Sequence, residues 1–163
     1  MLEFRLLDDS DIPLVERWLN KEHVKRCYEI PHLEVTISDW MTEIKERYGQ
    51  YQWLTHLIVV WQGCPIGLCQ YYKCVDSLDE DFGTLPLTGL YGIDYLIGEE
   101  AYIGKGLGKR MIKELVNKIF SFQDAQIVTA HIDRNNKASE NALLSCGFRL
   151  LYAESSRYFL QKL

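Results

Sequence analysis

The segment Ile103–Arg110, with the sequence IGKGLGKR, has three alternating glycines that run directly into an amphipathic helical pattern. Glycine allows a tight backbone turn and leaves no Cβ to obstruct a ligand. A helix start presents unpaired N–H groups and a partial positive charge, which together bind anions such as phosphate. We therefore predict a phosphate or pyrophosphate site rather than a plain glycine-rich turn before a surface helix. Its expected residues are Ile103, Gly104, Lys105, Gly106, Leu107, Gly108 and Lys109.

The spacing of these glycines distinguishes the segment from other phosphate-binding loops. It matches neither the G-x-x-x-x-G-K-[S/T] of nucleoside triphosphate binders nor the G-x-G-x-x-G of dinucleotide folds. It resembles the [Q/R]-x-x-G-x-[G/A] pyrophosphate loop of the GNAT superfamily of acetyl-CoA-dependent N-acetyltransferases. Gly106 and Gly108 match the two small positions, whereas Ile103 stands at the Gln/Arg position and departs from the motif there.

A second motif supports the same resemblance. Asn136–Ser139, followed by Cys146–Gly147–Phe148, is similar to the N-x-x-S/A…G-F segment of GNAT enzymes. In that family the segment follows the strand after the helix that begins at the pyrophosphate loop. A narrower similarity, to aminoglycoside 6′-N-acetyltransferases, is carried by the Gly-Ile-Asp of residues 91–98, the Pro-Ile-Gly…Gln-x-Tyr of residues 65–72, and the residues Arg5, Leu6, Trp18, Leu19 and Asn20.

The resemblance implies a fold, a cofactor and roles for particular residues. We expect one GNAT domain over residues 1–163, of the α/β class (α+β in some schemes), with a mixed, mostly antiparallel twisted sheet flanked by helices. We expect acetyl-CoA as cofactor, its pantetheine arm against the strand backbone of Tyr95, Leu96 and Ile97, and further contacts from Asn136 and Ser139. Many relatives use a tyrosine to protonate the departing thiolate. Leu143 stands at that place here, so Ser139 or solvent would have to serve.

Asp94 is the predicted catalytic base. A carboxylate beside an amine can orient it and accept its proton, directly or through water. Aspartate is also depleted in strands, and Asp94 lies between Ile93 and Tyr95. The alternative is an ordinary polar strand residue, with His131 as a rival base and His56 as a weaker one. We expect a cationic small-molecule amine to bind Asp94 with Tyr72, Tyr91, Asp79 and Asp81.

Two other functions remain open. The acceptor can be a protein amino terminus or another small amine, as in ribosomal-protein acetyltransferases. Alternatively, the chain is a regulatory module that holds CoA without turnover. The sequence predicts no nucleic-acid partner, since the formal net charge of −5 opposes non-specific binding to a polyanion. The oligomeric state is expected to be a monomer or homodimer.

The cellular context follows from the same sequence. Five cysteines without a C-x-x-C pattern, among them Cys64, Cys69 and Cys74, are typical of reduced core thiols in a cytoplasmic protein, without a metal site. Met1–Leu7 lacks the apolar core of a signal peptide, and no apolar run approaches the ~20 residues that span a bilayer.

Hydrophobic periodicity predicts elements in the order β-α-α-α-β-β-β-α-β-α-β-β. The expected strands cover residues 2–7, 53–61, 66–75, 90–98, 125–133, 148–153 and 158–163. The expected helices begin at Asp9–Asp11, Asn20, Thr36–Ser38, Leu107 and Asn136. Trp40, Ile44 and Tyr48 are expected on one face of the third helix, and Ala138, Ala142 and Leu143 on the inner face of the last. The long acidic loop over residues 76–89 has the length at which loops in compact domains are often functional.

Overall fold

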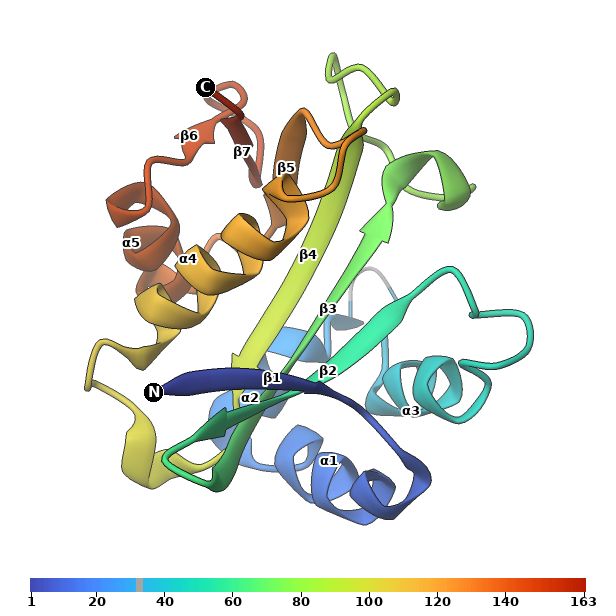
Figure 1. Cartoon of the computed structure of the whole chain (residues 1–163), viewed down its shortest axis with the longest axis vertical. Coiled ribbons are helices and arrows are strands. Elements are labelled where there is room, and N and C mark those ends of the chain that lie inside the picture. The colour runs from blue at the N-terminus through green and yellow to red at the C-terminus, as the bar shows by residue number, and fades with distance from the viewer. Residues whose placement is uncertain (32–33) are drawn as a thin grey trace. The chain divides into compact units, whose positions relative to one another are not determined.

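The computed structural model describes residues 1–31 and 34–163, and its helices and strands follow the predicted order (Figure 1). Its strands form one mixed sheet in the order β1-β2-β3-β4-β5-β7-β6, in which β4 and β5 are parallel and the pairs β1–β2, β5–β7 and β6–β7 are antiparallel. This confirms the predicted fold class. The chain divides into two compact units, residues 1–70 with 95–107 and residues 71–94 with 108–163. The assignment of the whole chain to one domain stays a prediction.

The first unit begins with a strand and three helices. Its elements are β1 (Leu2–Leu6), α1 (Ile12–Leu19), α2 (Glu22–Tyr28), α3 (Ile37–Lys45), β2 (Thr55–Trp61), most of β3 (Cys64–Lys73) and the end of β4 (Leu90–Ile97). A capping box starts α3, because Thr36 and Asp39 each accept a hydrogen bond from the other's backbone N–H. A second capping box, between Asp8 and Asp11, starts the helical turn before α1, one residue earlier than predicted.

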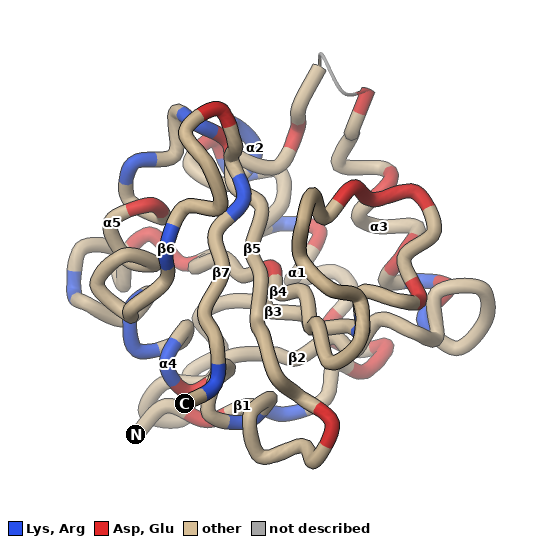
Figure 2. Tube along the Cα trace, turned by 90° about the horizontal axis from the view of Figure 1, so that it is seen from above, with Lys and Arg blue, Asp and Glu red and all other residues tan. Residues whose placement is uncertain are grey.

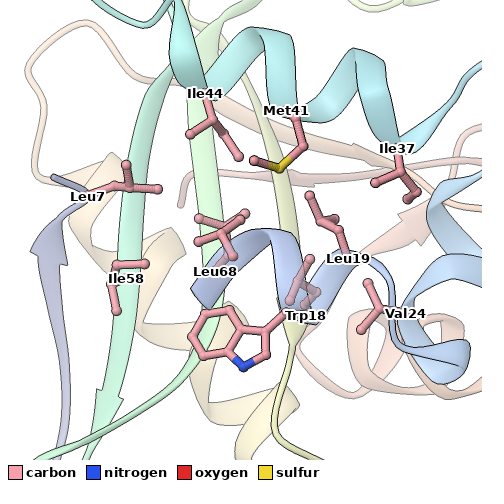
Figure 3. Packing of buried hydrophobic residues seen from close by; sticks show 11 residues of the cluster. Leu7, Trp18, Leu19, Val24, Ile37, Met41, Ile44, Ile58 and Leu68 are labelled. Atoms are coloured by element: carbon pink, nitrogen blue, oxygen red, sulfur yellow. The ribbon is translucent and has the colours of Figure 1, made fainter. Parts of the chain in front are cut away.

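The core of the first unit is built from the apolar faces of α1, α2 and α3 packed on the strands (Figure 3). Trp18 and Leu19 are fully buried, and Met41 and Ile44 of α3 belong to the same cluster as Ile58 of β2 and Leu68 of β3. The apolar face of α1 is therefore buried, with Ile12 partly buried at its edge.

The second unit contains α4 (Leu107–Phe120) from Gly108 onward, β5 (Ile127–His131), α5 (Lys137–Ser145), β6 (Arg149–Leu150) and β7 (Arg157–Gln161). The predicted apolar face of α4 is buried at Met111, Ile112, Leu115, Val116 and Ile119. Asn136 caps α5 by accepting a hydrogen bond from the Ser139 N–H at 3.2 Å. Gly147 ends it with a φ of +91°, the left-handed conformation that is typical of a glycine after a helix.

Four local predictions are wrong. Tyr48 lies beyond the end of α3 and is exposed, because the helix ends at Lys45. Ala138 is exposed, since α5 turns Ser139 inward instead, whereas Leu143 is buried as predicted and Ala142 is half-buried. Cys64 is exposed at the start of β3, so it is no core thiol, whereas Cys69 and Cys74 are buried. The strand expected over residues 148–153 is only Arg149–Leu150, because only these two residues pair with β7.

His56 makes the stability of the first unit depend on pH. Burial, together with the nearby Arg47 guanidinium, lowers the pKa of His56 from 6.5 to about 4. As the pH falls, His56 therefore gains its proton in the unfolded chain before it does so in the folded chain. The contribution of neutral His56 to the free energy of unfolding is complete above pH 6.5 and is lost as the pH falls toward 4.

We expect the free energy of unfolding to decrease by about 2 kcal/mol between pH 7 and pH 5 on account of His56. Urea unfolding at both pH values measures the change, and His56→Leu is the comparison, because leucine has no proton to gain. An equal loss in the variant would mean that other groups cause the acid sensitivity.

Candidate functional site

The glycine loop between β4 and α4 is open on the side where a ligand would need access. Gly104 and Gly106 both have a φ of +76°, and a Cβ built on either would meet no atom within 4 Å. This left-handed conformation favours glycine. Ile103 is exposed, and its N–H donates to the Glu100 carbonyl at 3.1 Å, so that N–H is already used within the turn. The loop thus presents bare backbone next to the start of a helix, which fits an anion.

Glu99 precedes this loop, and its side chain makes contacts with α1 and with Lys21 that the sequence did not predict. The Glu99 carboxylate accepts from the Trp18 indole Nε1 at 2.7 Å, from Arg17 at 2.5 Å and from Lys21 at 3.3 Å. The Trp18 donation, opposed by some burial and aided by Lys21 and Arg17, lowers the pKa of Glu99. Gly98 packs on the same indole so closely that a Cβ would lie 2.1 Å from Trp18 Cγ. Helix α1 therefore fixes the strand end from which the loop departs.

The parallel ladder between β4 and β5 ends well before either strand does. It runs from Leu90↔Ile127 to Gly92↔Thr129, although β5 continues to His131 and β4 to Ile97. Beyond it, within the first unit, α2 side chains reach the β4 carbonyls. The Tyr28 hydroxyl donates to the Tyr95 carbonyl, and the His23 Nε2 lies 2.9 Å from the Ile97 carbonyl. Two backbone carbonyls of the strand that was predicted to pair with a pantetheine arm thus already have side-chain partners.

The residues of the second unit that were predicted to bind the cofactor lie at the starts of α4 and α5. Gly108 and Lys109 belong to the first turn of α4, and Lys109 is exposed. Figure 2 shows basic positions on α4. The Asn136 side chain is used as the α5 cap, and Ser139 is buried. Leu143 is fully buried, so the place expected for a hydroxyl donor holds an apolar side chain.

Asp94 and Tyr72 belong to one cluster in the second unit. Burial, then the negative charges of Asp94 and Glu80, raises the pKa of Tyr72 strongly, which keeps its hydroxyl protonated. That hydroxyl donates to Glu80 Oε1 at 2.7 Å. The other oxygen of Glu80, Oε2, accepts from Arg157 Nη2 at 2.7 Å. Asp94 itself is half-buried. The sequence singled out Asp94 and Tyr72 but missed Glu80 and Arg157.

The remaining predicted acceptor residues lie elsewhere. Tyr91 is buried against Phe122, its hydroxyl donates to Asp124 at 2.8 Å, and burial with that bond raises its pKa to about 12. The structure thus gives Tyr91 other partners than the Asp94 cluster. Asp79 is exposed, and Asp81 accepts from the Gly83 N–H at 2.8 Å. His131 is exposed at the end of β5.

Metal sites and membrane spans are both absent from residues 1–31 and 34–163. These ranges contain no group of three or more His, Cys, Asp or Glu side chains suited to holding a metal ion. None of the helices in that part of the chain combines the length and apolar character needed to cross a membrane. All five cysteines lie in these ranges, and none forms a disulfide.

Comparison with known families decides the classification. The model of the acetyltransferase (GNAT) domain matches residues 8–153, which include the glycine loop, Asp94 and the α5 cap. The chain belongs to the GNAT acetyltransferase family.

The GNAT domain is also similar to curated acetyltransferases. Aminoglycoside N(6′)-acetyltransferase type 1 of Klebsiella pneumoniae is 27% identical over 117 residues, which cover 72% of this chain and 58% of that protein. The protein of the same name from Serratia marcescens gives the same values. The chain therefore spans little more than half the length of these relatives.

Solved structures agree with the fold. A structure of AAC(6′)-Ib in complex with ribostamycin and coenzyme A has a TM-score of 0.82 at 20% identity, covering 99% of this chain and 93% of that one. The aminoglycoside N(6′)-acetyltransferase of Legionella pneumophila has a TM-score of 0.76 at 21% identity, covering 98% and 91%. At these identities, the likeness establishes the fold.

Proposed function

We propose that this chain is an acetyl-CoA-dependent N-acetyltransferase whose acceptor is an amine of an aminoglycoside-type aminosugar, in the position of the 6′-amine. The observation that carries the proposal is the continuity of β4. This strand bears Asp94 and then Tyr95–Ile97, and the open glycine loop follows within ten residues. The proposed base, the strand backbone proposed to hold the cofactor and the proposed diphosphate site thus follow one another along one segment of the chain.

The residues of the glycine loop and the starts of two helices suit the cofactor. The backbone of Gly104 and Gly106 is unobstructed, as a diphosphate requires, and Lys105 and Lys109 are exposed cations beside it. When bound, acetyl-CoA supplies an activated acetyl thioester. Because Tyr28 and His23 already contact the Tyr95 and Ile97 carbonyls, the backbone N–H groups of Tyr95–Ile97 would hold its arm. A backbone N–H in this strand is the natural donor to the oxyanion.

Asp94 would orient the acceptor amine and receive its proton, because an aminosugar amine is protonated near neutral pH and must lose a proton to react. Holding the amine and the thioester together removes much of the entropic cost of the reaction. Ser139 or solvent would protonate the leaving thiolate, since Leu143 carries no acidic proton. We further propose that the reaction takes place in the cytoplasm and confers aminoglycoside resistance, in a monomer or homodimer.

The acceptor class rests on the curated and structural relatives named for aminoglycosides and on the acidic residues of the loop that follows β3. Asp79 and Asp81 are exposed on the loop that also carries Glu80. A polycationic aminosugar gains more from such carboxylates than a neutral acceptor does.

A screen of acceptors read out by release of the CoA thiol tests the proposal. We expect turnover with kanamycin- and tobramycin-type aminoglycosides and little with a basic peptide. Turnover of the peptide in preference to the aminosugars would favour acetylation of protein amino termini. Tight CoA binding without transfer to any amine would favour a regulatory module.

A further inference from the structure

Arg157 is a buried cation whose contacts all lie within the second unit. Its side chain is 5% exposed. Nη2 donates to Glu80 Oε2 at 2.7 Å, Nη1 donates to Thr129 Oγ1 of β5 at 3.2 Å, and the guanidinium lies 4.7 Å from the centre of the Phe82 ring. A buried charge requires such partners, because water does not solvate it. Two of the three, Glu80 and Phe82, come from the acidic loop, which covers residues 77–89 in the structure because Asp76 ends a short helical turn.

Glu80 connects the acidic loop to β3 as well. Its Oε1 accepts from the Tyr72 hydroxyl at 2.7 Å, while Ser77 Oγ lies 3.4 Å from the same oxygen. Phe82 is buried beside Arg157, whereas Asp79 and Asp81 on either side of Glu80 are exposed. The loop is therefore held at positions 80 and 82, and these two anchors determine where its exposed carboxylates lie.

The same contacts reach the strand that carries the candidate base. The Tyr72 ring covers Gly92 so closely that a Cβ there would lie 2.3 Å from Tyr72 Cζ. Asp94 follows two residues later, and its charge acts on both Tyr72 and Cys74. Arg157, Glu80 and Tyr72 thus connect β7, the acidic loop and the Asp94 strand in one continuous set of contacts.

We propose that Arg157 and Glu80 are a positioning pair that holds the acidic loop against the acceptor side of the Asp94 strand and so determines affinity for a cationic amine. Neither residue need touch the reacting atoms. This inference rests on the proposed function for its kinetic part. Its structural part, the anchoring of the loop, can be measured without any substrate.

The direction in which each of two single substitutions changes the acceptor KM separates a positioning role from a direct effect of charge. Glu80→Gln removes a negative charge, and Arg157→Met removes a positive one. If only the local charge mattered, the first would raise the KM for a cationic acceptor and the second would lower it. If the pair anchors the loop, both raise that KM, and the double variant is no worse than the worse single variant, because the anchor is lost only once.

The experiment measures acceptor KM, acetyl-CoA KM and kcat for the three variants, with kanamycin as the acceptor. We expect the acceptor KM to rise roughly 10-fold in each, with acetyl-CoA KM unchanged and partial recovery in Arg157→Lys. Arg149→Met is the matched control. Arg149 also lies over an aromatic ring, Phe159 at 5.7 Å, but it is exposed and has no contact with the loop among those described. We expect it to behave as the wild type.

Hydrogen exchange of residues 77–89 without substrate gives the second measurement. We expect faster exchange there in Arg157→Met and Glu80→Gln, with the helices of the second unit unchanged. Unchanged exchange in the loop, opposite KM shifts in the two single variants, or an equal rise in acetyl-CoA KM would each overturn the positioning role. Absence of turnover by the wild type with every amine, with the loop exchange as expected, would instead refute the proposed function alone.

Discussion

Asp94→Asn is expected to lower kcat for amine acetylation by about 10²–10⁴-fold, the range that general-base catalysis contributes. Asparagine has nearly the same shape as aspartate but cannot accept the proton of an ammonium group. The half-buried position on β4 can hold the amide without a steric change. Steady-state kinetics with a saturating aminoglycoside measures kcat, and calorimetric titration with CoA measures the affinity for the cofactor. CoA affinity should change little, because Asp94 precedes the residues proposed to hold the cofactor.

Asp39→Asn is a suitable control for the change from carboxylate to amide. Asp39 is exposed in the first turn of α3, where its side chain accepts from the Thr36 N–H at 2.8 Å, and an asparagine oxygen can accept the same bond. We expect near wild-type kinetics from this variant. If Asp94→Asn reduced CoA binding and turnover by the same factor in a folded protein, Asp94 would be a structural residue of the strand.

Gly106→Val is expected to weaken CoA binding by roughly 10-fold or more, before any effect on the chemical step. The φ of +76° at Gly106 disfavours every residue with a Cβ, and a β-branched side chain most of all. The space around this position is open, so the substitution creates no clash within the protein. Its cost comes from backbone strain and from two methyl groups placed where a diphosphate would approach. Calorimetric titration with CoA measures the loss of affinity directly.

Gly63→Val serves as the matched control for strain. Gly63 has a φ of +81°, and a Cβ added there would also meet no atom within 4 Å, but it lies in the turn between β2 and β3. Both variants should lose similar stability in urea unfolding, and only Gly106→Val should lose CoA affinity. Equal CoA affinity in the two variants would exclude the glycine loop as the diphosphate site.

Local patterns in the sequence predicted most of the elements of the fold. The capping box of Thr36 and Asp39, the Asn136 cap and the Gly147 stop each depend on residues a few positions apart. The same holds for the glycine loop, whose open backbone follows from the absence of side chains at Gly104 and Gly106. Such features form wherever the segment folds, because their hydrogen bonds and dihedral angles are local.

The predictions for Tyr48 and Tyr91 relied on local spacing alone, and the structure departs from both for physical reasons. Tyr48 continued the spacing of Trp40 and Ile44, but the helix ends at Lys45 and no tertiary contact buries the tyrosine. Tyr91 is an aromatic residue three positions before Asp94, yet it packs with Phe122 and bonds Asp124 instead. Periodicity indicates which face a residue occupies within an element, and it does not indicate which partner covers that face.

The family motifs, the order of elements and a candidate for the base could all be found in the order of the amino acids. Which side chains meet across long separations depends on the folded chain. Glu80 and Arg157 are 77 residues apart, and Trp18 and Glu99 are 81 apart. In the sequence, Glu80 is one of several acids in a charged loop, and nothing local distinguishes it from Asp79 or Asp81. Its inward direction depends on a buried cation supplied by β7, because that cation needs a counter-charge only once the sheet and the loop have enclosed it.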